Sequence, residues 1–81
     1  MYYFYILQNN YGKLYCGYTQ NVDLRVLKHN QSSGAKYTSK YKNFQLVFKQ
    51  EFDTKQEALK RESQIKKWSR SKKLALINDK L

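Results

Sequence analysis

The 81-residue sequence predicts a small α+β domain in which helices pack on a three-stranded antiparallel or mixed sheet, in the order ββαβαα. Three observations favour this class. Two short tyrosine-rich segments flank a turn signal, a third apolar segment follows a basic loop, and helix-capping residues precede the remaining apolar stretches. The chain holds no proline, repeat or low-complexity tract, so we expect residues 1–81 to form a single domain.

The amino-terminal part predicts a β-hairpin. Residues 2–7 (YYFYIL) are apolar on both faces and rich in aromatic side chains, which is typical of a central strand. The letters NNYG at positions 9–12 signal a turn, and residues 13–18 form the returning strand. The turn can be a three-residue loop in which Gly12 takes the left-handed backbone conformation.

The length of that loop decides which side chains share a face of the sheet. A three-residue loop places Tyr5 opposite Gly17. The same register places Tyr15 opposite Leu7, so that the two tyrosines are diagonal neighbours on one face. A loop one residue longer or shorter would put them on opposite faces. A shared tyrosine site therefore depends on the odd-length turn.

The middle of the chain predicts one helix, a loop and a third strand. Residues 22–29 predict a helix capped by Thr19 or Asn21. The polar, basic stretch that follows predicts a loop, and residues 44–52 (FQLVFKQEF) predict the strand.

Two further helices are each preceded by residues that can cap them. A helix is expected over residues 55–68, and its candidate caps and capping-box partners are Asp53, Thr54, Gln56 and Glu57. A last short helix begins at Ser69 or Ser71, with Leu74 and Ile77 as its buried stripe.

Charge is the strongest compositional signal. Lys and Arg number 16 against 6 Asp and Glu, which gives a formal net charge of +10. Such a chain is attracted to polyanions, so nucleic acid is the leading partner class. An anionic membrane surface is a weaker alternative, because no basic helix has a clean lipid-facing apolar side. A small basic protein without a specific ligand is the other alternative.

Cysteine usage and hydropathy indicate the setting of the protein. The single cysteine permits no disulfide within the chain and favours a reducing, cytoplasmic compartment. No apolar run is long enough to cross a membrane, and the amino terminus lacks the pattern of a secretory leader. One histidine and one cysteine make zinc an unfavoured metal, and the three glycines form no phosphate-binding loop.

Glu62 is the residue whose position points most directly to chemistry. It falls in the middle of the inward stripe that periodicity predicts for its helix, which consists of Ala58, Leu59 and Ile65. A carboxylate there is costly unless it is paired or binds a metal. The structural alternative is an i,i+4 ion pair with Lys66 on the helix surface.

Three other residues have both a functional and a structural interpretation. Arg25 and His29 are four residues apart on one helix face, and a guanidinium suits a phosphate. A solvated arginine and a hydrogen-bonded surface histidine are the commoner outcomes. Cys16 lies in mid-strand and faces away from Tyr15, so we expect a small buried apolar residue and not a nucleophile.

Several of these residues occur in an order that resembles the GIY-YIG nuclease domain. The ordered set is Tyr3-Phe4-Tyr5, Tyr15-Cys16-Gly17, Arg25, and Glu62 within ALKRESQIK. The resemblance covers the whole chain, although Tyr3 stands where the family motif begins with glycine. The segments HNQSSGAKYT and FDTKQEALKRESQIKKWSRSKK further resemble the small single-domain bacterial branch of that family.

The resemblance implies a role for each matched residue. Tyr5 and Tyr15 match motif tyrosines, one of which deprotonates, or helps to deprotonate, the attacking water. Arg25 matches the arginine that holds the scissile phosphate, and His29 matches a histidine common in this branch. Glu62 matches the carboxylate that binds one divalent metal ion, Mg²⁺ or Mn²⁺, which suits a chain so poor in acids. Tyrosine has a free pKa of about 10, so Arg25, the metal and nearby lysines would have to lower it.

The expected function is metal-dependent hydrolysis of DNA phosphodiester bonds, with structure-specific cutting of branched or nicked DNA in repair or recombination as the finer expectation. Gly17 is expected to leave room for a phosphate, and Tyr37 or Trp68 to stack on a base or simply to pack. The basic residues expected to contact the DNA backbone are Lys36, Lys40, Lys42, Lys66, Lys67 and Arg70. One alternative is a nucleic-acid-binding module with this fold and little turnover. Another is a subunit that docks on an acidic protein, and a protein partner could also supply specificity.

Overall fold

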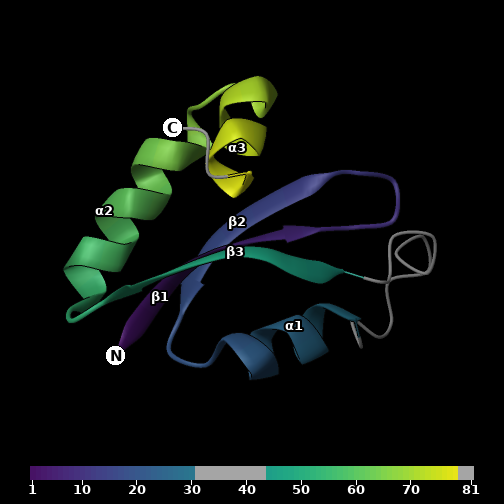
Figure 1. Cartoon of the computed structure of the whole chain (residues 1–81). Helices are drawn as coiled ribbons and strands as arrows, with labels where there is room; N and C mark the ends of the chain where they lie inside the picture. The colour runs from purple at the N-terminus through teal and green to yellow at the C-terminus, as the bar shows by residue number, and fades with distance from the viewer. Residues whose placement is uncertain (31–43, 79–81) are drawn as a thin grey trace.

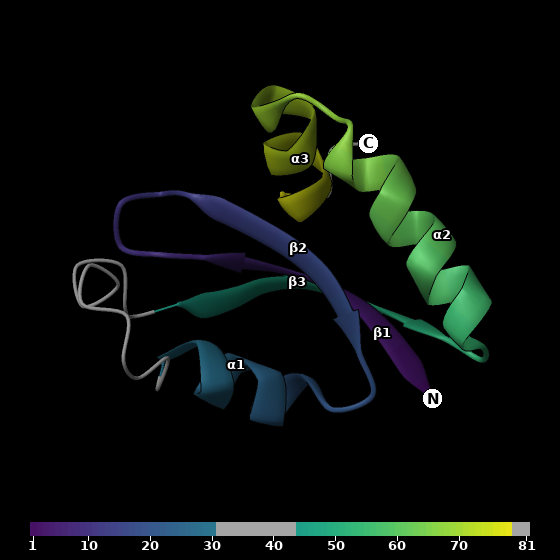
Figure 2. The same ribbon diagram turned by 180° about the vertical axis from the view of Figure 1, so that it is seen from behind.

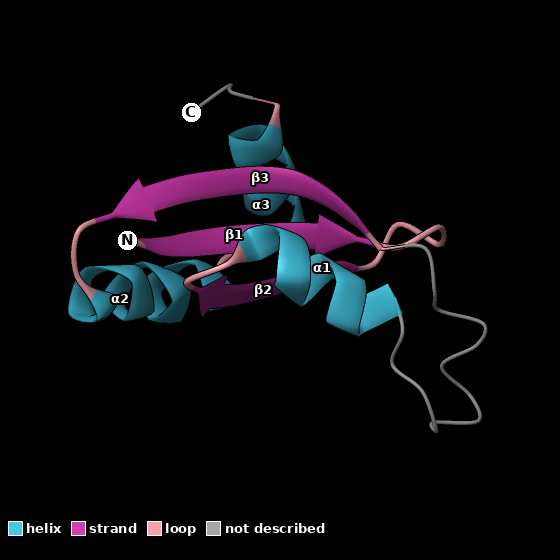
Figure 3. Cartoon of the chain, turned by 90° about the horizontal axis from the view of Figure 1, so that it is seen from below, coloured by secondary structure: helices cyan, strands magenta, loops and turns pink. Residues whose placement is uncertain are grey.

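The structure, a computed structural model, describes residues 1–30 and 44–78, apart from the side chain of His29. The elements are β1 (Tyr2–Gln8), β2 (Leu14–Thr19), α1 (Val22–Asn30), β3 (Gln45–Phe52), α2 (Lys55–Lys66) and α3 (Arg70–Ile77). The predicted ββαβαα order is therefore confirmed. Both strand pairs are antiparallel, and β1 is the central strand, as its apolar faces predict (Figure 3).

The hairpin between β1 and β2 has the predicted register. The Asn9 N–H donates to the Lys13 carbonyl at 3.1 Å, and the Gly12 N–H donates to the Asn9 carbonyl at 3.0 Å. Gly12 has a φ of 83°, the left-handed value that a three-residue loop requires. As a result Tyr5 pairs with Gly17 and Leu7 with Tyr15.

The two faces of the sheet carry different helices. The helices α2 and α3 cover one face, and α1 lies against the other (Figures 1 and 2). Phe4, Ile6 and Ile65 are fully buried on the first face and form the centre of the core. Since side chains alternate along a strand, Tyr5 and Leu7 face α1, and they are also buried.

The capping alternatives are resolved by hydrogen bonds. Asn21 Oδ1 accepts from the Leu24 N–H at 3.0 Å and caps α1. Thr54 Oγ1 accepts from the Glu57 N–H at 3.3 Å and caps α2. Ser69 Oγ accepts from the Lys72 N–H at 3.2 Å and caps α3.

Three details of the helices differ from expectation. Leu59 was expected in the buried stripe of α2 but is 39% exposed, because that helix meets the sheet along the narrower line of Ala58 and Ile65, both 0% exposed. The helix also ends at Lys66, two residues earlier than predicted, and the chain turns before α3 begins. In α3 the predicted Ile77 packs against the core, but Leu76 packs there in place of the predicted Leu74, and no residue of this helix is fully buried.

Candidate active site

An open cleft of about 760 Å³ lies at the outer edge of β2. Four of the residues to which the sequence assigned catalysis line this cleft, and each comes from a different element. They are Tyr5 of β1, Tyr15 of β2, Arg25 of α1 and Glu62 of α2. The fifth, His29, lies in α1, and its side chain is outside the described residues.

Tyr5 reaches the cleft across a glycine. The side chain is only 4% exposed, yet it contributes to the cleft lining. A β-carbon on Gly17 would lie 2.5 Å from Tyr5 Oη and 2.7 Å from Cζ, so the phenol ring rests directly on this backbone. The space at Gly17 that was expected to admit a phosphate is therefore filled by the Tyr5 ring on that face.

Burial raises the pKa of the Tyr5 phenol above its ordinary value. The Arg25 charge acts in the opposite direction, while Glu62 and Cys16 add to the increase. The expectation that neighbouring cations lower this pKa is not met at Tyr5 in the protein alone, because removal from water outweighs the guanidinium. Tyr5 is thus a neutral hydrogen-bonding group near neutral pH.

Tyr15 is held by contacts on its ring. The Phe44 ring meets it edge-on, with centroids 4.9 Å apart and planes at 85°. Lys13 Nζ lies 5.3 Å from the Tyr15 centroid. Both contacts fix the plane of a phenol that borders the cleft.

Arg25 lies on α1, which places two cations at the cleft. Arg25 is exposed and lines the cleft together with Lys28, three residues further along α1. Lys55, at the start of α2, lines it as well and lies 6.0 Å from the Tyr18 ring. Neither lysine was among the residues predicted to contact DNA. Lys28 could have been found from its i,i+3 spacing to Arg25, which puts the two side chains on one helix face.

Glu62 approaches from the face of the sheet opposite to Tyr5. It lies on α2 and reaches the cleft at the edge of β2, and not over the tyrosine face as predicted. Its side chain is 14% exposed and pairs with Lys66 at 3.9 Å. The i,i+4 ion pair and a site in the cleft are therefore compatible, since Lys66 is 59% exposed and the contact is long.

The carboxylate of Glu62 fits one kind of metal ion. Among the described residues, no group of three or more His, Cys, Asp or Glu side chains comes together. A cation that demands an all-protein cage does not match this donor set. Mg²⁺ or Mn²⁺ does match it, because such ions keep several waters and are bound by one or two carboxylates together with substrate phosphate.

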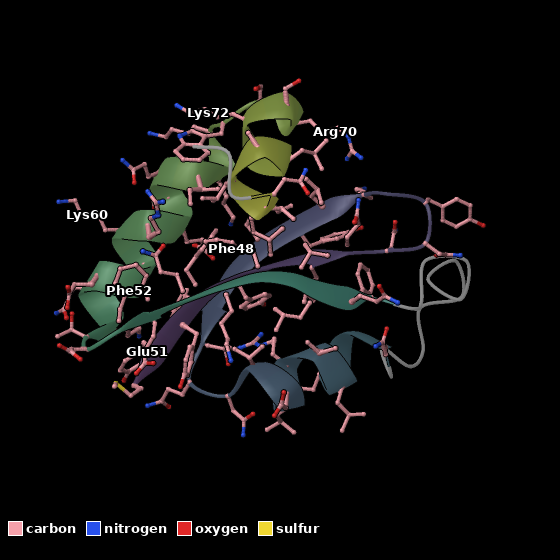
Figure 4. The ribbon with its side chains drawn as sticks, in the orientation of Figure 1. Phe48, Glu51, Phe52, Lys60, Arg70 and Lys72 are labelled. Carbon is pink, nitrogen blue, oxygen red and sulfur yellow. The ribbon has the colours of Figure 1, made fainter. Side chains whose placement is uncertain are left out.

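The predicted phosphate-contacting residues fall into two groups. Lys66, Lys67 and Arg70 are exposed on the helical layer and do not line the cleft. The Arg70 guanidinium lies against the hairpin, where a β-carbon on Gly12 would be 3.2 Å from its nitrogen, and Figure 4 shows Lys60, Arg70 and Lys72 on the outside of this layer. Lys36, Tyr37, Lys40 and Lys42 lie outside the described residues.

Trp68 and Cys16 have packing roles. Trp68 contacts the core cluster, with Lys72 Nζ 4.3 Å and Arg61 Cζ 5.5 Å from its ring centroid. Cys16 is a free, half-buried thiol on the core side of β2. Burial raises the pKa of the Cys16 thiol, against the opposing charge of Lys73, so the protonated form is favoured as expected for a packing residue.

Within residues 1–30 and 44–78, no helix is both long enough and apolar enough to cross a membrane.

The chain is similar to small bacterial proteins over almost its whole length. A UPF0213 protein of Staphylococcus saprophyticus is 51% identical over 77 residues, covering 95% of this chain and 94% of the relative. A UPF0213 protein of Staphylococcus epidermidis is 47% identical over 75 residues, covering 93% and 92%. The solution NMR structure of a UPF0213 protein from Bacillus halodurans is 43% identical, has a TM-score of 0.63, and is matched over 99% of this chain and 86% of that one.

The family model of the GIY-YIG catalytic domain matches residues 1–75. This range includes the two tyrosine motifs of the hairpin, the arginine of α1 and the glutamate of α2, which the fold brings to one cleft. The chain belongs to the GIY-YIG catalytic domain family and has a nuclease-like fold.

Proposed function

We propose that the protein is a divalent-metal-dependent endonuclease that hydrolyses DNA phosphodiester bonds in the cleft at the edge of β2. The observation that carries the proposal is the convergence of Tyr5, Tyr15, Arg25 and Glu62, which come from four elements, on one open cleft. Two phenols, one guanidinium and one carboxylate can supply the proton transfer and the charge stabilisation that phosphodiester hydrolysis needs.

The surroundings of Arg25, Tyr5 and Tyr15 assign a different role in the reaction to each. Arg25 is exposed at the cleft and can bind two oxygens of the scissile phosphate through its planar guanidinium. Tyr5 is buried with a raised pKa, so its hydroxyl serves as a fixed hydrogen-bonding group that orients the attacking water or the phosphate. Tyr15, as its phenolate, is then the group assigned to accept the proton of that water while the water oxygen bonds to phosphorus. The ester P–O bond breaks, and its oxygen leaves and takes up a proton from solvent.

The cleft also accounts for how DNA would be held. Among the described residues, three cations, Arg25, Lys28 and Lys55, line it together with one carboxylate, Glu62. Glu62 would hold the Mg²⁺ or Mn²⁺ ion, which supplies a Lewis acid for the phosphate oxygens. Exposed lysines and arginines on α2 and α3 add sequence-independent attraction to the DNA backbone.

The direct test is cutting of nicked, flapped and branched DNA with Mg²⁺, with Mn²⁺ and with chelator. We expect Glu62→Gln to lose about 100-fold or more of the activity, because a bound cation stabilises transition-state charge by several kcal/mol. Glu51→Gln is the matched control, since Glu51 is an exposed carboxylate of β3 outside the cleft (Figure 4). Equal cutting by wild type and Glu62→Gln would refute the proposal, as would cutting that persists in chelator.

A second candidate is a nucleic-acid-binding module with the same fold and little turnover. One observation favours it: burial raises the pKa of Tyr5, which is unfavourable for a base. DNA binding that weakens steeply with salt, without cutting in either metal, would support this candidate over the endonuclease.

A further inference from the structure

The last residue of α1 is hydrogen-bonded to Phe44, the residue that directly precedes β3. Asn30 Nδ2 donates to the Phe44 carbonyl at 3.1 Å, and Asn30 Oδ1 accepts from the Phe44 N–H at 2.6 Å. A carboxamide that exchanges both bonds with one main-chain residue imitates the pairing of two strand residues. Asn30 therefore fixes both the position and the orientation of the Phe44 main chain, which lies 14 positions further along the sequence.

Phe44 connects Asn30 to the cleft through a ring contact. Its ring meets the Tyr15 ring edge-on with centroids 4.9 Å apart. Tyr15 lines the cleft, whereas Asn30 and Phe44 do not. The contacts run from the Asn30 side chain through Phe44 to a phenol at the proposed reaction centre.

Among the described residues, α1, which carries Arg25, buries little apolar surface against the rest of the protein. Among the described α1 side chains only Val22 is buried, at 6% exposed, while Leu24 and Leu27 are each 49% exposed. A helix with so little buried apolar area gains little from packing. Its position depends strongly on its two ends, which are the Asn21 cap and the Asn30 bonds to Phe44.

We propose that Asn30 is a positioning residue of the active site, which orients Tyr15 through Phe44 and holds the carboxyl end of the Arg25 helix at the cleft. This inference rests on the proposed nuclease function. Asn30 touches neither substrate nor metal in this proposal. It acts by fixing the relative placement of the two groups that handle the proton and the phosphate, and a misplacement of about 1 Å can cost about 100-fold in rate.

The test compares two substitutions of Asn30 with a control of similar structural cost. Asn30→Asp keeps the shape and the acceptor for the Phe44 N–H but places a carboxylate oxygen against the Phe44 carbonyl. Asn30→Ala removes both bonds. Ser69→Ala removes the cap of α3, which lies outside the cleft, and lowers Tm without touching Phe44.

Two readouts are measured on each variant, the NMR signals of the Tyr15 and Phe44 ring protons and the kcat and KM for DNA cutting. We expect both Asn30 variants to shift the ring signals, since an edge-on ring contact moves those resonances. We expect kcat to fall about 10-fold or more with a smaller change in KM, and Ser69→Ala to leave both readouts near wild type.

Three results would overturn the inference. The first is unchanged ring signals in Asn30→Ala. The second is an unchanged kcat in a variant whose ring signals have moved. The third is a loss of kcat in Ser69→Ala equal to that in the Asn30 variants, which would mean that lowered stability alone explains the loss. Absence of cutting by the wild-type protein would instead refute the proposed function, and the ring signals would still show whether Asn30 orients Tyr15.

Discussion

Gly17→Ala is the substitution that tests the geometry of the cleft most directly. The added methyl group would lie 2.5 Å from Tyr5 Oη, 2.7 Å from Cζ and 3.1 Å from Cε2. Ordinary van der Waals contact begins near 3.4 Å. The Tyr5 ring must therefore retreat by about 1 Å, and it has little room, because proteins are densely packed and the side chain is 4% exposed.

The size of the effect follows from two separate consequences. Overpacking of this kind costs about 1–3 kcal/mol of unfolding free energy, which lowers Tm by roughly 5–15 °C in a domain of this length. Displacement of the hydroxyl by about 1 Å lowers cutting by about 100-fold. Gly17→Ala adds no backbone strain, because Gly12, and not Gly17, is the glycine with a positive φ in the described structure.

The assay measures Tm and single-turnover cutting for Gly17→Ala in two backgrounds. In wild type we expect both losses. In a Tyr5→Leu background the stability loss should shrink, because the shorter side chain leaves room for the methyl group and the two sites are in direct contact. If Gly17→Ala melts and cuts as wild type does, or if its cost is the same in both backgrounds, the ring does not rest on Gly17 and the reasoning fails.

Two further predictions concern titratable groups of the site. Because burial raises the pKa of Tyr5, its contribution to stability is fully present below the unfolded value near 10 and is lost as pH rises through the folded pKa. The urea midpoint should therefore fall more between pH 9 and pH 11 in wild type than in Tyr5→Phe, and equal slopes would contradict the raised pKa. Because burial raises the pKa of Cys16, alkylation by iodoacetamide at pH 8 should be about 10-fold slower in folded than in urea-unfolded protein, and equal rates would contradict its packing role.

The hairpin could be predicted because its register depends on local signals alone. The NNYG turn signal allowed a three-residue loop with Gly12 in the left-handed conformation, and that loop length decides which residues pair. Tyr5 and Tyr15 on one face followed from that single inference. The central position of β1 likewise followed from a strand that is apolar on both faces.

The cleft could not be placed from the sequence because it depends on where the helices dock. Periodicity predicted that Glu62 faces the sheet but not which face α2 covers, so the carboxylate was expected over the tyrosines and lies instead across the edge of β2. The raised pKa of Tyr5 depends on burial against Gly17, which local pattern does not reveal. The Asn30 bonds to Phe44 join residues 14 positions apart and also have no local signature.

The placement of the cleft on an edge strand links solubility to the proposed DNA binding. In the described structure β2 pairs only with β1, and an unpaired strand edge is a template for association with another chain. The cations that line the cleft along this edge, Arg25, Lys28 and Lys55, repel a second copy of the same edge and attract a polyanion.

Removing charge from the edge should therefore affect both properties. We expect Lys28→Gln with Lys55→Gln to lower DNA affinity and to reduce the slope of log affinity against log salt by up to about 1.8, if each lysine neutralises one phosphate of duplex DNA. The same variant should aggregate at lower concentration in light scattering. Lys60→Gln with Lys67→Gln removes the same charge from exposed positions outside the cleft, so it should change both properties less. Equal effects of the two pairs would mean that net charge, and not its position on the β2 edge, governs binding and association.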